Sequence, residues 1–149
     1  MSLALIVICA AVLFSWIVLW IKRTRDRRVM EQHSITPEEL HTLMTSTQEV
    51  LLFDVRQPLD LLANTEIIPG AKRIPPRELL ENPSLIPHEK DSVAYCTCPG
   101  DKTSRAITYR ALAMHFYRVK FLKGGLAAWK AKGYPVEPYQ ETFHLDIAT

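Results

Sequence analysis

Cysteine is scarce in this chain of 149 residues, which has only three. So few cysteines exclude a secreted domain whose fold depends on several disulfide bonds. They are consistent with a domain in the cytoplasm, where cysteines stay reduced. The five histidines are widely spaced and show no paired ligand pattern, and one Cys-x-Cys pair lacks the further ligands that a zinc site needs. The sequence therefore predicts neither a metal site nor another cofactor.

Ionisable side chains are absent from residues 3–21. A helix over this run would be about 28 Å long, close to the roughly 30 Å of a bilayer's hydrocarbon core. No Lys or Arg precedes the run and bulky residues end it, which disfavours a cleaved signal peptide, and a buried core helix of such uniformity is uncommon. We predict a transmembrane helix over 1–21 with the lipid bilayer as its partner.

Charge of one sign dominates the segment that follows. Residues 22–28 carry five basic side chains and one acidic one, and we read 22–33 as a basic juxtamembrane linker. The positive-inside rule then places the N-terminus outside and the rest of the chain in the cytoplasm, at the cell (inner) membrane. Beyond residue 28 there are thirteen basic against fifteen acidic side chains, so no nucleic-acid partner is expected.

The remainder alternates between strand and helix patterns. Apolar runs predict strands over 50–55 and 93–96, and further short strands are expected over 71–74, after the Pro69-Gly70 turn, and over 119–122. Helices are expected over 34–44, 77–82, 104–116 and 126–132. Thr36 and Glu39 form a capping-box pattern in the first of these helices, with Pro37 at its first position. The alternation favours an α/β domain with a mainly parallel sheet over 34–138, followed by a tail at 139–149.

Cys96 ends the apolar run 93–96 and precedes a loop and a helix start. A thiol beside a helix N-terminus is stabilised as an anion by free backbone N–H groups and the helix dipole, which favours a nucleophile. A buried structural cysteine is the alternative. The loop that would surround the thiol comprises Thr97, Cys98, Pro99, Gly100, Asp101, Lys102, Thr103 and Ser104.

Five features in order carry a family resemblance. They are Leu52-Phe53-Asp54-Val55-Arg56, the acidic Asp60, Ile68-Pro69-Gly70-Ala71, Tyr95-Cys96, and Gly124-Gly125 with Trp129, Gly133, Pro135 and Val136. Together they resemble the rhodanese-like sulfurtransferase domains, including those of bacterial membrane-associated proteins. The resemblance implies a three-layer α/β/α domain, here preceded by one transmembrane helix.

The resemblance also implies a reaction. Cys96 would take sulfane sulfur from thiosulfate or a persulfide, form a cysteine persulfide, and pass the sulfur to a thiol acceptor, which could be a protein thiol. Backbone N–H groups of the loop would surround the persulfide. Asp54, Arg56 and Asp60 are expected to have a structural role, with Arg56 paired to an acid such as Asp60 to hold a loop.

The loop departs from the family pattern. Where these domains place an Arg, this chain has Asp101, or Lys102 if one residue is inserted, and a Lys lacks the bidentate fork of Arg. The departure leaves two alternatives open: a non-catalytic sulfur carrier or docking module tethered to the membrane, and an oxyanion enzyme of the phosphatase or arsenate reductase type. The second alternative requires an Arg, such as Arg105, to bend back toward the loop.

Cys98 is a second departure. Cys96-Thr97-Cys98 could form a strained internal disulfide, Cys98 could resolve a persulfide on Cys96, or Cys98 could simply fill the loop. The residues alone do not choose among these three interpretations.

Overall fold

The computed structural model describes residues 2–140 and divides the chain into two compact units. The first is a single helix, α1 (Leu3–Gln32), so the predicted basic linker continues the apolar segment as helix. By length and composition α1 is the one helix among the described residues that is suited to cross a membrane, a property that signal sequences near an N-terminus share.

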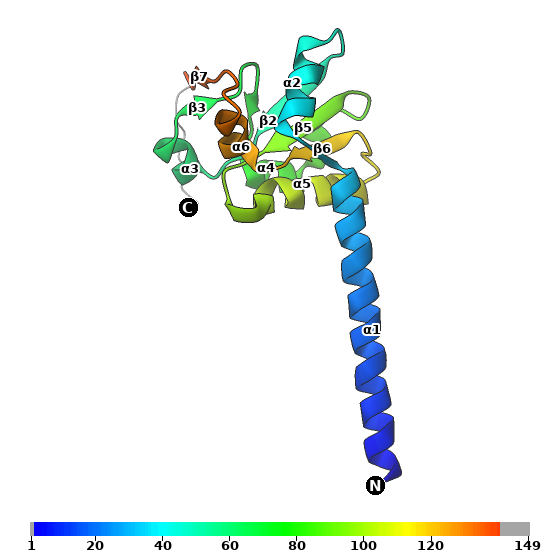
Figure 1. Ribbon diagram of the computed structural model, residues 1–149. Coiled ribbons are helices and arrows are strands. Elements are labelled where there is room, and N and C mark those ends of the chain that lie inside the picture. Colours follow the sequence, from blue (N-terminus) through cyan, green and yellow to red (C-terminus); the bar gives the residue numbers. More distant parts are fainter. Residues whose placement is uncertain (1, 141–149) are drawn as a thin grey trace. The chain divides into compact units, whose positions relative to one another are not determined.

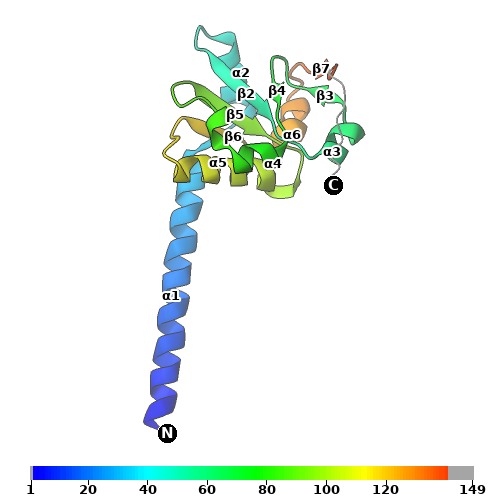
Figure 2. The same cartoon turned by 180° about the vertical axis from the view of Figure 1, so that it is seen from behind.

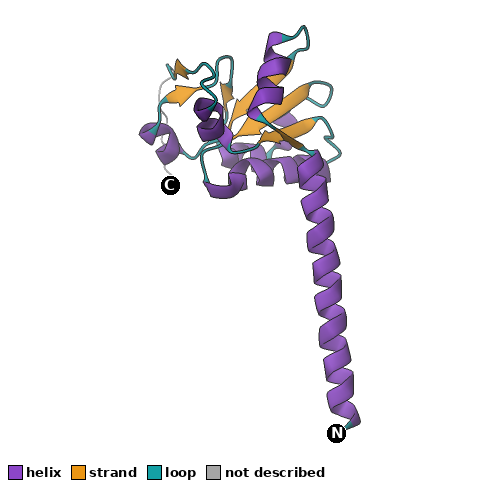
Figure 3. Ribbon diagram, in the orientation of Figure 1, coloured by secondary structure: helices purple, strands orange, loops and turns teal. Residues whose placement is uncertain are grey.

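The second unit begins at His33 and is built on a five-stranded sheet. Every pairing in this sheet is parallel. The strands lie in the order β1 (Ser34–Ile35), β6 (Val119–Leu122), β5 (Asp91–Tyr95), β2 (Val50–Asp54) and β4 (Lys72–Arg73) (Figure 3). The α/β fold and the mainly parallel sheet predicted from the sequence are therefore confirmed.

Helices cover both faces of the sheet (Figure 1). Ala94 and Cys96 point to one face, where the buried cluster includes side chains of α4 (Pro76–Glu81) and α5 (Lys102–Ala113). Val93 and Tyr95 point to the other, where α2 (Pro37–Thr45) and α6 (Gly125–Ala131) pack. Figure 2 shows α4 and α5 side by side on the first face. This alternation, which has the period of two that strands impose, produces three layers.

The start of α2 shows how local chemistry fixes an element. The Thr36 hydroxyl accepts from the Glu39 amide at 3.2 Å, and the Glu39 carboxylate accepts from the Thr36 amide at 2.9 Å. The predicted capping box is thus formed, and it starts the helix at Pro37. The prediction that the helix includes Ser34 and Ile35 was wrong, because these residues pair with β6 as strand β1.

Several small elements were not predicted. They are α3 (Pro58–Ala63), the 3₁₀ turns η1 (Pro83–Leu85) and η2 (Pro99–Asp101), and an antiparallel pair formed by β3 (Glu66–Ile67) and β7 (Glu137–Pro138). Two-residue strands and single turns are too short to show hydrophobic periodicity, which explains why the sequence did not reveal them. Of the predicted tail, 139 and 140 follow β7 and the rest lies outside the described residues.

Candidate active site

Cys96 lies directly after β5, at the carboxyl end of a central strand, and only 1% of it is exposed. Its carbonyl oxygen accepts from the Leu126 amide at 3.2 Å, which ties the strand end to the start of α6. A Cβ added at Gly125 would lie 1.9 Å from that oxygen. Glycine at 125 therefore permits the close approach of α6 to the cysteine, and the sequence showed this glycine only as part of a motif.

The loop after Cys96 turns sharply into α5. Gly100 and Asp101 both have positive φ, 68° and 56°, so two successive left-handed residues redirect the chain. The Asp101 amide donates to the Cys98 carbonyl at 3.1 Å and closes the turn. Pro99 and Gly100 are exposed, whereas Thr97 and Cys98 are half-buried. The loop thus brings Cys98 back against the first residues of α5.

Two sulfur atoms meet at the N-terminus of α5. The Sγ atoms of Cys96 and Cys98 are 2.8 Å apart, and both cysteines are free thiols. Cys98 Sγ accepts from the Thr103 amide at 3.2 Å, and the Cys98 thiol donates to the Thr103 hydroxyl oxygen at 3.3 Å. Cys96 Sγ lies 3.5 Å from the Ser104 hydroxyl, which donates to the Asp101 carbonyl. The sequence-predicted cysteine therefore shares its site with a second thiol.

The two thiols have opposite pKa shifts. Burial and the hydrogen bond to Cys98 raise the pKa of Cys96, against the effect of Ser104 and the Cys98 amide. Burial also acts to raise the pKa of Cys98, but the hydrogen bonds from Cys96 and Thr103 outweigh it and lower that pKa. Since hydrogen bonds donated to a thiolate favour the charged form, Cys98 is the more acidic of the two thiols.

The charged residues of the loop point elsewhere. The Asp101 carboxylate accepts from the Gly124 amide at 2.9 Å, so it fastens the loop to the turn before α6. Lys102 is exposed. The Arg105 guanidinium lies 5.3 Å from the centre of the Phe121 ring. The Arg105 side chain therefore lies against Phe121 of the sheet. It does not bend back toward the loop, as an oxyanion enzyme would require.

Arg56 and Asp54 form an ion pair in which both side chains are fully buried. Arg56 Nε donates to both carboxylate oxygens at 2.9 and 3.0 Å, and its other nitrogens donate to the carbonyls of Asn64 and Glu66 at 2.6 and 2.9 Å. Among the described residues the ion-pair partner of Arg56 is Asp54, not Asp60 as expected. Asp60 lies in the first turn of α3, where its carbonyl accepts from the Asn64 amide.

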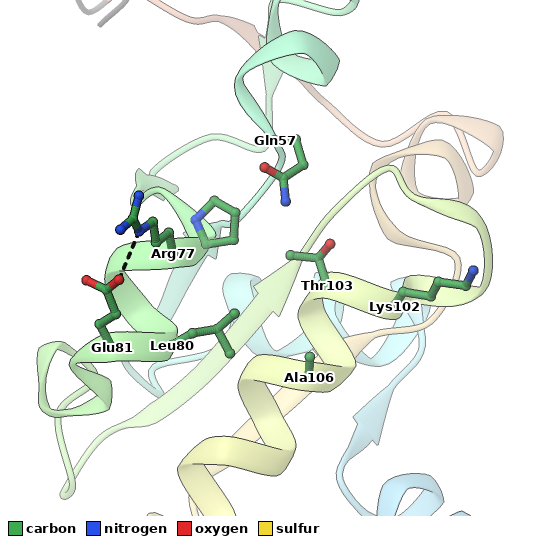
Figure 4. Close-up of a pocket in the computed structure, with 8 residues that line it drawn as sticks. Gln57, Arg77, Leu80, Glu81, Lys102, Thr103 and Ala106 are labelled. Atoms are coloured by element: carbon green, nitrogen blue, oxygen red, sulfur yellow. Dashed lines mark hydrogen bonds and ion pairs between the residues drawn. The ribbon is translucent and has the colours of Figure 1, made fainter. Parts of the chain in front are cut away.

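A groove of about 430 Å³ runs beside the loop, between α4 and the first turns of α5. Figure 4 shows Gln57 and Thr103 facing one another across it, while the Lys102 side chain extends away from α4. The lining residues are Gln57, Pro76, Arg77, Leu80, Glu81, Lys102, Thr103 and Ala106. Because Thr103 also contacts Cys98, the groove lies next to the Cys98 side of the thiol pair. Gln57 and the α4 residues were missed because no local motif marks them.

Comparison with known proteins identifies this architecture. The Rhodanese-like domain family matches residues 36–132. A protein named "Sulfurtransferase" from Allochromatium vinosum is 32% identical over 104 residues, which cover 70% of this chain and 94% of that protein.

Solved structures agree with this assignment. A rhodanese-related protein from Thermoplasma volcanium superimposes with a TM-score of 0.57 and 25% identity, over 70% of this chain and 97% of that one. The Alr3790 protein from Anabaena sp. gives a TM-score of 0.60 and 28% identity, over 70% and 82% of the two chains. The family and the named relative support sulfurtransferase activity in general. This chain belongs to the rhodanese-like domain family.

Proposed function

We propose that this protein is a membrane-anchored sulfurtransferase that carries sulfane sulfur on Cys96. The observation that carries the proposal is the pair of sulfur atoms 2.8 Å apart at the N-terminus of α5. The Cys98 sulfur accepts from the Thr103 amide, so the site accommodates a negative charge next to the thiol that must lose a proton.

The proposed cycle has two steps. The Cys96 thiol gives its proton to Cys98 and attacks the outer sulfur of thiosulfate, so that the sulfur–sulfur bond of the donor breaks and sulfite leaves. An acceptor thiolate then attacks the outer sulfur of the Cys96 persulfide and departs with it, which restores the Cys96 thiolate. A persulfide donor would enter by the same displacement, with a thiolate as the leaving group.

Two features of the structure would allow such a donor to approach Cys96. The groove beside Thr103 reaches from solvent to the loop and is mostly apolar along α4 and α5. The Asp101 carboxylate, whose charge would repel a dianionic donor, accepts a hydrogen bond from the Gly124 amide. Its hydrogen bond reduces the repulsion that a dianionic donor would meet.

The activity is tested by sulfite release from thiosulfate in a single turnover of the full chain in detergent. Glutathione persulfide serves as a second donor, with intact mass as the readout. Wild type and Cys9→Ser are expected to react alike, because Cys9 lies in α1, and Cys96→Ser is expected to be inactive. No sulfite release from thiosulfate, together with no mass change of the folded wild type on treatment with glutathione persulfide, would contradict the proposal.

The membrane anchor is a separate part of the proposal. The apolar stretch of α1 and the basic residues that follow it favour a single span with the domain in the cytoplasm at the inner membrane. In bacterial cells that express the chain, carbonate extraction should leave it in the membrane. A membrane-impermeant maleimide should label Cys98 only after permeabilisation. Extraction by carbonate would refute the anchor, and labelling in intact cells would refute the orientation.

A further inference from the structure

The sulfur atoms of Cys96 and Cys98 are close enough for bond formation with little movement. Their separation is 2.8 Å, whereas a disulfide bond is about 2.05 Å long. The loop folds back so that Cys98 contacts Cys96. The left-handed conformations of Gly100 and Asp101 and the hydrogen bond from the Asp101 amide to the Cys98 carbonyl hold it in this conformation. If Cys98 simply filled the loop, its thiol would not need to contact the thiol of Cys96.

The environments of the two thiols differ in a way that assigns them different roles. Cys96 is buried at the end of β5, whereas Cys98 is half-buried and packs against the edge of the same core cluster. The Thr103 amide donates to Cys98 Sγ, and this donor stabilises its thiolate. A thiolate held against a sulfur that becomes oxidised is the arrangement of a resolving cysteine.

We propose that Cys98 resolves the Cys96 persulfide by attacking Cys96 Sγ, releasing hydrosulfide and closing a Cys96–Cys98 disulfide. This inference rests on the proposed formation of a persulfide at Cys96. It adds a second outcome to sulfur transfer: the sulfane sulfur leaves as hydrosulfide when no acceptor thiol takes it first.

The step balances in atoms and electrons. The Cys98 sulfur forms a bond to Cys96 Sγ, the bond from Cys96 Sγ to the outer sulfur breaks, and its electron pair leaves with the outer sulfur. The proton that Cys98 received from Cys96 goes to the departing sulfur, which becomes HS⁻. The two cysteine sulfurs are oxidised to a disulfide and the sulfane sulfur is reduced. An external dithiol would reduce the disulfide before the next cycle.

The geometry also decides which sulfur Cys98 attacks. Displacement at sulfur proceeds in line, so the outer sulfur must lie on the side of Cys96 Sγ opposite to the attacking thiolate. Cys98 already contacts Cys96 Sγ itself, so attack there needs no loop rearrangement. Attack on the outer sulfur would instead move the persulfide to Cys98 and release no hydrosulfide.

The experiment uses the full chain in detergent, reduced and freed of reductant, with thiosulfate or glutathione persulfide as the donor. Hydrosulfide is measured, and the protein is alkylated and weighed intact. Wild type and the control Cys9→Ser should release about one hydrosulfide per chain and lose two alkylation sites. Cys98→Ser lacks the proton acceptor of the first step, so it should take up sulfur more slowly than wild type, release no hydrosulfide and retain about 32 Da of added sulfur on Cys96 when uptake is complete. Cys96→Ser should neither take up sulfur nor release hydrosulfide.

The outcomes separate the two proposals. A wild type that keeps the added sulfur and releases no hydrosulfide would overturn the resolving role of Cys98 and leave the sulfurtransferase proposal intact. Hydrosulfide release by Cys98→Ser equal to that of wild type would overturn it as well. If neither wild type nor Cys98→Ser takes up sulfur from either donor while circular dichroism shows both folded, both proposals fail.

Discussion

Replacing Arg56 by methionine tests the buried ion pair that Arg56 forms with Asp54. The variant leaves the Asp54 carboxylate fully buried without its guanidinium partner, and the carbonyls of Asn64 and Glu66 lose their donors. Removing one member of a buried pair costs about 3–5 kcal/mol, because an uncompensated charge remains in a medium of low polarity. Since domains are stable by about 5–15 kcal/mol, we expect Arg56→Met to lose a large part of the folding free energy.

Pulse proteolysis of the full chain across a urea series measures this loss. Arg118→Met is the matched control, because Arg118 forms an exposed pair with Asp91 and should cost less than about 1 kcal/mol. The double variant Asp54→Asn/Arg56→Met removes both charges and should be less destabilised than the sum of the two single variants, by about 1–3 kcal/mol. A loss below about 1 kcal/mol in Arg56→Met, or strict additivity, would refute the reasoning.

Two further predictions concern the loop. Thr103→Val removes the hydroxyl whose hydrogen bond with Cys98 lowers the pKa of that thiol and keeps the amide, so the pKa of Cys98 should rise and its alkylation by iodoacetamide should reach half-maximum at a higher pH than in wild type; an unchanged midpoint would contradict this. Gly125→Ala should lower the free energy of unfolding by at least about 2 kcal/mol, because the added Cβ would overlap the Cys96 carbonyl at a positive φ. Gly70→Ala, at positive φ in open space, is its control and should cost about 1–2 kcal/mol when measured in the same urea series.

Local patterns in the sequence were sufficient for the main elements. The Thr36–Glu39 capping box fixes the start of α2, and the apolar run fixes β2, because these signals depend on residues that are neighbours in the chain. The same logic placed Cys96 at a strand end before a helix. Trp129, which belongs to the last segment of the family resemblance, is fully buried, and its indole N–H donates to the Pro135 carbonyl at 2.8 Å.

The sequence by itself determined the apolar first helix, the alternating α/β elements and the position of Cys96 beside a helix N-terminus. Only the tertiary structure decided that Arg56 pairs with Asp54, that Asp101 binds the Gly124 amide, and that the two sulfurs lie 2.8 Å apart. The physical reason is that these contacts depend on left-handed loop residues and on the register of parallel strands. Hydrophobic periodicity carries no information about either.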